Sequence, residues 1–190
     1  MTIAGVGKTL IHLLRDGYRA LHAGSLQGLS FELFTTNSFE NSPLNKVSLF
    51  LYRLEVDPTR RHKESPPRSF GDPRRVALSV DLRFLLTVWV GDAEREHQVL
   101  QDCIEILERN AIIQRPQLDP EYPWEPDDAL RVCIDALSHE DMMRLWDLLE
   151  PTYRLSVPYV VRSVKLTGIE ERSAPPVLSR TNTYVPGVDG

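Results

Sequence analysis

The residues near the N-terminus come closest to a known chemical motif. Gly7-Lys8-Thr9 matches the end of a phosphate-binding loop, in which backbone amides and a lysine surround the phosphates of a nucleotide. That loop also needs a glycine five positions before Gly7 and a strand that leads into it. Thr2 occupies that position, and no strand can precede it. We therefore expect a helix start with Lys8 in solvent, and nucleotide binding or catalysis through Gly7, Lys8 and Thr9 is kept as an alternative function.

The histidines, cysteines and carboxylates do not combine into a metal site or an acid–base pair. His97 and Cys103 are six residues apart on one predicted helix and point to different parts of it. We expect His97 to be a partly buried helix residue. The acids of this helix have the spacing of a solvated face; they are Glu94, Glu96, Asp102, Glu105 and Glu108. No GxSxG, HExxH or glycine-rich dinucleotide motif occurs, so we predict no catalytic, cofactor-binding or metal-binding residue and no cofactor.

The longest patterned segment, residues 76–100, predicts a strand, a turn and a helix. Apolar residues alternate from Val76 to Val90 with the period of two that a strand requires. Asp92 is the predicted N-cap, since its side chain can accept from the first free amides of a helix that continues to about Asn110. The two cysteines, Cys103 and Cys133, lie in apolar segments, which favours packed free thiols.

The remaining patterns predict two more helices and four more strands. The helices are expected at 2–22 and from Ser138 to Pro151, and the strands at 29–36, 46–56, 129–135 and 155–169. The strand at 46–56 is apolar on both faces, which indicates a central strand, and Pro158 indicates an edge or a bulge. Residues 114–127 hold four prolines and should be irregular, with Trp124 fixing them to the core.

The order of these elements decides the fold class. Three strands follow one another without intervening helices, which excludes the strict alternation of a doubly wound parallel fold. We predict an α+β fold: a mixed, mainly antiparallel sheet with helices packed on it. One domain is expected at residues 1–170, followed by an extended C-terminal arm at 171–190.

Charge is unevenly distributed along the chain. The net charge is −5 over 190 residues, yet residues 58–75 hold six Lys or Arg and only two acids. A globally acidic chain is a poor general binder of nucleic acid. No apolar run approaches the roughly 20 residues of a membrane span. The composition therefore predicts no nucleic-acid partner and no direct membrane span, and a basic loop that could meet an acidic protein surface.

Three segments together resemble a known family. They are SLFLYRLEVDP (48–58), LRFLLTVWVGDAEREHQVL (82–100) and LWDLLEPTYRLSVPYVVRSV (145–164). Their order and spacing resemble the N-terminal domain of the cap, or tube-terminator, proteins of phage-tail-like extracellular contractile injection systems of the antifeeding-prophage and Photorhabdus virulence cassette type. One departure is Asp57-Pro58, where the family often has Asn-Pro.

The resemblance implies a phage tail-terminator-like fold and a structural role without enzymatic activity. Proteins of this kind form a ring, typically hexameric, at the end of the tail distal to the baseplate. The ring stops polymerisation of the inner tube and engages the last sheath layer. The implied partners are thus further copies of the chain, the inner-tube protein and the sheath protein. The implied location is the cytoplasm of the producing cell, in an assembled particle that can be released.

Two segments are candidates for contacts between subunits. The basic loop 58–75 could pair with the acidic helix 93–110 of a neighbour, since a closed ring uses two different patches of each subunit. The tail 173–190 could dock on a neighbour or simply be disordered. The candidate interface residues are Arg60, Arg61, Arg68, Arg74, Arg75 and Tyr184. A monomeric adaptor that recruits cargo or membrane is a further alternative.

Overall fold

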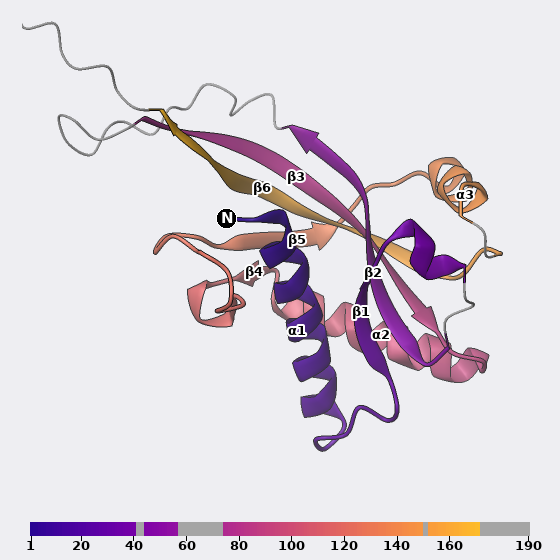
Figure 1. Ribbon diagram of the computed structural model, residues 1–190. Helices are drawn as coiled ribbons and strands as arrows, with labels where there is room; N and C mark the ends of the chain where they lie inside the picture. The colour runs from indigo at the N-terminus through magenta and orange to yellow at the C-terminus, as the bar shows by residue number, and fades with distance from the viewer. Residues whose placement is uncertain (41–43, 57–73, 150–151, 172–190) are drawn as a thin grey trace, which may run out of the picture.

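A six-stranded sheet forms the centre of the protein (Figure 1). The computed structural model describes residues 1–40, 44–56, 74–149 and 152–171, with the backbone alone at 74–77 and 167–171. The strands are β1 (Ser30–Phe34), β2 (Lys46–Val56), β3 (Arg74–Trp89), β4 (Ile112–Ile113), β5 (Leu130–Ile134) and β6 (Ser156–Glu171). The helices are α1 (Ile3–Leu21), α2 (Ala93–Arg109) and α3 (His139–Asp147), with the short 3-10 turns η1 (Thr36–Phe39) and η3 (Arg115–Gln117).

The sheet is mixed and mainly antiparallel, as predicted. Its strand order is β1-β2-β3-β6-β5-β4, and β1 is parallel to β2 whereas every other described pair is antiparallel. The two longest strands, β3 and β6, lie at its centre and run beside each other from Arg74 opposite Glu171 to Thr87 opposite Ser156. The α+β class is therefore confirmed, and β2 lies inside the sheet as expected.

Local sequence signals set the start of each helix. The side chain of Thr2 accepts from the amide of Gly5 (3.0 Å), that of Asp92 from Arg95 (2.8 Å), and that of Ser138 from Asp141 (3.1 Å). Each bond satisfies an amide that has no partner within its helix. The N-caps predicted from the sequence are therefore confirmed.

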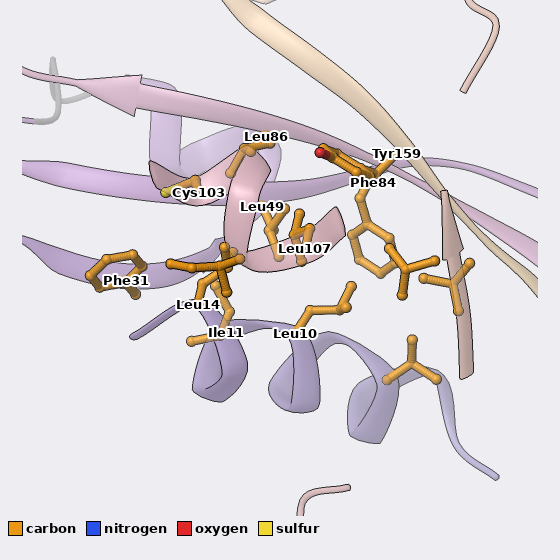
Figure 2. Close-up of a cluster of buried hydrophobic side chains, with 14 of the residues drawn as sticks. Leu10, Ile11, Leu14, Phe31, Leu49, Phe84, Leu86, Cys103, Leu107 and Tyr159 are labelled. Atoms are coloured by element: carbon orange, nitrogen blue, oxygen red, sulfur yellow. The ribbon is translucent and has the colours of Figure 1, made fainter. Parts of the chain in front are cut away.

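β3 supplies side chains to a hydrophobic layer on each face of the sheet. Leu82, Phe84 and Leu86 point toward α1 and α2, and Figure 2 shows Phe84 and Leu86 with Leu10 and Leu14 of α1 and Leu107 of α2. Leu85 and Trp89 lie on the opposite face of β3 and point toward α3. This two-sided use explains why β3 is apolar on both faces over its second half.

A second, aromatic cluster lies between the sheet and α3. Its buried members are Phe34, Phe39, Leu85, Trp89, Met142 and Trp146. The ring centroid of Trp89 is 5.9 Å from that of Phe34 and 6.1 Å from that of Trp146, within the range of favourable aromatic pairs. The cluster fixes the short helix α3 on the sheet.

β6 differs from the expectation based on its proline. Pro158 predicted an edge or a bulge, but β6 is paired on both sides, with Pro158 opposite Leu85 of β3. The carbonyl of Pro158 still accepts from the amide of Asp135 (2.8 Å). The proline therefore lacks only the hydrogen bond that a backbone N–H at its position would donate. The register of β6 against β3 shifts instead at two other places. At one of them, Ser163, β6 carries one extra residue between the pairs Leu82–Val161 and Val80–Val164.

We expect Asp81→Ala to lower the free energy of unfolding by about 1–3 kcal/mol, because it removes the acceptor that holds this bulge. Ser163 has a left-handed φ of 58°, and its amide donates to the carboxylate of Asp81 (2.8 Å). Asp81→Asn keeps an oxygen acceptor and should lose less. Urea denaturation followed by circular dichroism measures both variants, and equal losses would show that the bond does not hold the bulge.

Candidate assembly surface

The glycine-lysine-threonine triplet is part of the packed structure of α1. A Cβ on Gly7 would lie 2.9 Å from a methyl carbon of Leu33, so the glycine allows α1 to approach β1 closely. Thr9 is fully buried, and its hydroxyl accepts from the amide of Asp119 (3.0 Å). Lys8 is exposed, as expected. Since these residues lie inside a helix and not in a loop after a strand, the geometry of a phosphate-binding loop is absent from this stretch.

Two histidine–carboxylate pairs occur among the described residues. His12 Nδ1 lies 3.2 Å from Asp119 Oδ2, and the second pair joins the C-terminal end of α1 to α2. His22 Nε2 lies 2.9 Å from Asp102 Oδ2, and Gln98 donates to the other carboxylate oxygen (3.0 Å). Asp102 was predicted on the solvated face of α2, which is wrong, since the residue is buried. The adjacent Cys103 is fully buried, and burial raises the pKa of its thiol. A buried, neutral thiol is a poor nucleophile, so Cys103 does not form a catalytic group with His22 and Asp102. The His22–Asp102 pair instead holds the two helices together.

The expectation for His97 is also wrong. His97 is exposed, because the buried stripe of α2 is rotated away from it. The stripe consists of Val99, Leu100, Asp102, Cys103, Ile106 and Leu107. Trp89 and Trp124 are both buried, as expected for packing residues. Over the described ranges, no three His, Cys, Asp or Glu side chains gather where they could hold a metal ion.

A charged network lies on the α3 side of the sheet, and its partners all belong to this chain. The guanidinium of Arg83 contacts Glu55 (2.8 Å) and Asp135, and the hydroxyl of Tyr52 donates to Asp135 (3.0 Å). Burial raises the pKa of Asp135, but the hydrogen bonds from Arg83 and Tyr52 and the charge of Arg83 outweigh it, so this pKa lies below its usual value. The network is internally satisfied and therefore structural.

The sheet extension is the first of two exposed apolar surfaces. We define it as residues 53–56 of β2, 78–83 of β3 and 161–166 of β6. Figure 1 shows that β3 and β6 continue past the N-terminal end of α1. Leu54, Val56 and Leu78 are 43%, 37% and 39% exposed. They are paired with Leu82, Val80 and Leu166, so they continue the core face of the sheet beyond its helices. The middle of this face is covered, since Val80 and Leu82 are fully buried, but Leu54, Val56 and Leu78 at its margin remain exposed.

The α3 corner is the second exposed apolar surface. It comprises α3 and the residues up to Leu155 that the structure describes. Leu148 is 83% exposed, the highest value for a large apolar side chain in the described ranges, and Tyr153 and Leu155 are 48% and 38% exposed. The ring of Tyr153 packs against Trp146 (5.9 Å between centroids). The corner immediately precedes β6, whereas the sheet extension contains the middle of that strand (Figure 1).

Most of the candidate interface residues fall outside the described part of the chain; these are Arg60, Arg61, Arg68 and Tyr184. Arg74 and Arg75 are the first residues of β3 and stand opposite Glu171 and Glu170 of β6. On α2, Glu96 and Glu105 have basic partners in the same chain, Arg154 (3.7 Å) and Arg109 (3.0 Å). The pairing of a basic loop with this helix therefore stays a prediction.

No helix in the described ranges is long and apolar enough to cross a membrane. The described residues thus form two exposed apolar surfaces and one charged network whose members are paired with one another. Gly7 and Thr9, which the sequence offered as candidates for nucleotide binding, are packed in the core. Such an inventory is typical of a protein that binds other proteins.

Solved structures of similar fold come from contractile injection systems. The sheath/tube terminator of the PVC extracellular contractile injection system, in its extended state, matches with a TM-score of 0.64 and 21% identity over 99% of this chain. The tube-terminating cap of the anti-feeding prophage matches with a TM-score of 0.59 and 20% identity over 97% of this chain. This chain spans 65% and 62% of the length of those two proteins.

The sequence itself gives a more specific result. No curated protein matches it significantly. A family model described as the Pvc16 N-terminal domain matches residues 5–180, which is nearly the whole chain. The family predicted from the three quoted segments is thereby confirmed: the chain belongs to the Pvc16 N-terminal domain family.

Proposed function

We propose that this chain is a structural cap that terminates the tube of a contractile injection system. It forms a ring, hexameric in its family's manner, at the end distal to the baseplate, where it stops addition of inner-tube protein and engages the last sheath layer. The cap is made in the cytoplasm of the producing cell and enters the assembled particle there. The C-terminal arm, residues 171–190, and the basic loop 58–75 contribute to contacts between subunits.

The observation that carries this proposal is the family match over residues 5–180, joined to the fold shared with two proteins described as a tube terminator and a tube-terminating cap. The exposed apolar faces of the sheet extension and the α3 corner support it, because a structural component needs surfaces for its neighbours. The burial of Thr9 and the packing of Gly7 argue against the alternative of nucleotide binding.

We expect co-expression with the inner-tube and sheath proteins to produce tubes of limited length with this chain at one end. A cap that blocks the growing end must shorten the length distribution as its ratio to tube protein rises. Electron microscopy of tubes with a gold-labelled chain measures both the length and the position of the label.

The control is the same tube preparation without the chain, which should show a broad distribution of long tubes. Label along the whole tube, or an unchanged length distribution at every ratio, would refute the cap function. A chain that stays monomeric in every mixture would favour the adaptor alternative.

A further inference from the structure

We propose that successive copies of this chain join through the sheet extension of one copy and the α3 corner of the next. This inference rests on the proposed ring and names its interface. The two surfaces differ in structure: the α3 corner precedes the first residue of β6, and the sheet extension contains residues 161–166 in the middle of that strand (Figure 1). Contacts between two different patches of identical subunits are heterologous, and such contacts close into rings when the rotation allows it.

The margin of the sheet extension is only partly covered by the described part of this chain. Val80 and Leu82, in the middle of the extension, are fully buried, whereas Leu54, Val56 and Leu78 around them are not. Leu54, Val56 and Leu78 thus surround an apolar strip from which water is already excluded. Covering them would remove further apolar area from water, at about 25 cal/mol per Å².

The α3 corner presents apolar side chains that suit this strip. Leu148 is almost fully exposed, and Tyr153 and Leu155 add an aromatic ring and a second leucine at the start of β6. Tyrosine is a preferred residue at protein interfaces because its ring buries a large area and its hydroxyl can remain hydrated. The corner is held rigidly by the aromatic cluster beneath α3, so binding would order few further side chains.

The charges of the two surfaces are complementary. The extension holds four basic residues against two acids: Arg53, Arg83, Arg162 and Lys165 against Glu55 and Asp81. Arg162 and Lys165 are exposed and form no ion pair within the described ranges, whereas Glu55 and Arg83 neutralise each other. Because the extension is a single layer of strands in Figure 1, a partner on its apolar face lies within about a Debye length, roughly 10 Å, of these cations.

The α3 corner has the opposite sign. Its described residues hold three acids and two arginines: Glu140, Asp141 and Asp147, with Arg144 and Arg154. Arg144 pairs with Glu140 (2.6 Å), which leaves Asp141 and Asp147 without a basic partner among the described residues. Arg154 is engaged within its own chain, 3.7 Å from Glu96 and above the ring of Trp89. The corner therefore offers an acidic, apolar surface to the basic, apolar extension, and this complementarity selects a second copy of the chain as the partner.

The two surfaces are well separated on one subunit. Ten strand residues lie between Leu155 and Leu166, so the eleven steps of about 3.3 Å place these two leucines roughly 35 Å apart along β6. One subunit can therefore contact two different neighbours, one through each surface. This is the requirement for a closed ring.

A cysteine pair tests the contact. Leu78→Cys and Leu148→Cys are placed together in full-length chains carrying Cys133→Ser, since Cys133 is half-buried and Cys103 is fully buried. The chains are assembled on tubes and treated with a flexible bismaleimide. We expect a ladder of cross-linked oligomers from the double variant, only dimers from a mixture of the two single variants, and no product from either single variant alone. Ala20→Cys, exposed on α1, replaces Leu78→Cys as the matched control and should give no ladder.

Three results would overturn the interface. Dimers from Leu78→Cys alone would show that two extensions meet. A product between Leu78→Cys and the tube or sheath protein, without a ladder, would assign the extension to that partner. No ladder from double-variant chains that cap tubes normally would refute the interface while leaving the cap function intact. Wild-type chains that neither form rings nor shorten tubes would instead refute the proposed function itself.

Discussion

Replacing Trp89 with alanine should lower the free energy of unfolding by about 3–5 kcal/mol, a large part of the roughly 5–15 kcal/mol that stabilises a typical domain. Trp89 is 2% exposed and contacts the rings of Phe34, Phe39 and Trp146. Its removal would leave a cavity beneath α3 and detach the α3 corner from the sheet. Urea denaturation monitored by circular dichroism measures the loss.

The chain supplies a matched control for the polar part of this effect. Trp89 Nε1 donates to the hydroxyl of Ser48 (2.8 Å), which is fully buried, whereas Trp146 Nε1 is buried without a hydrogen-bond partner among the described residues. Trp89→Phe and Trp146→Phe remove similar volumes, but only the first breaks a hydrogen bond. We expect Trp89→Phe to cost about 1–2 kcal/mol more. Equal costs would mean that the bond to Ser48 contributes nothing.

Asp135→Ala should lower the free energy of unfolding by about 3 kcal/mol at neutral pH, because it leaves the half-buried cation of Arg83 without its main partner. This is the low end of the range for a broken buried pair, since Glu55 still contacts Arg83. Glu55→Ala is the control. The Glu55 side chain is 33% exposed, and its loss should cost no more than about 1 kcal/mol.

The same carboxylate gives the stability a defined dependence on pH. The pKa of Asp135 is lower in the folded protein than in the unfolded chain, where it is near 3.9. The folded state therefore binds this proton less readily, and its contribution is complete above about pH 4. It is lost as the pH falls through the lower, folded-state pKa. The difference between wild type and Asp135→Ala should consequently shrink below pH 4, and a constant difference at all pH values would contradict this assignment.

The elements of this fold could be predicted because their signals are local. Thr2, Asp92 and Ser138 each cap a helix through an amide three residues away, and the alternation in β3 is visible within one segment. The family could likewise be predicted, because its characteristic residues lie in β2, in β3 with α2, and in α3 with β6. Each of those segments is continuous in the sequence.

The features that were missed depend on contacts between distant segments. Asp102 looked like a solvated acid because its partner, His22, is on another helix, although its position between Val99 and Cys103 in the buried stripe was a usable signal. The internal place of Pro158 follows from the pairing of β6 with β3, and the two-residue strand β4 is too short to give a pattern. The exposed apolar faces arise where strands extend beyond the helices that cover the sheet. The periodicity of a single segment does not show how far a helix from another part of the chain will cover it.

The central position of β6 has a consequence for how the protein folds during synthesis. The sheet consists of an N-terminal half, β1-β2-β3, and a C-terminal half, β4-β5-β6, and only the pairing of β3 with β6 joins them. Non-local pairing of this kind is slow to form, and the ribosome must deliver residues up to about 171 before it can be completed. Because β6 links the α3 corner to the sheet extension, an unfinished chain lacks both surfaces in their final form. If these surfaces join the copies, we therefore expect a chain to enter an assembly only after β6 has been synthesised and paired.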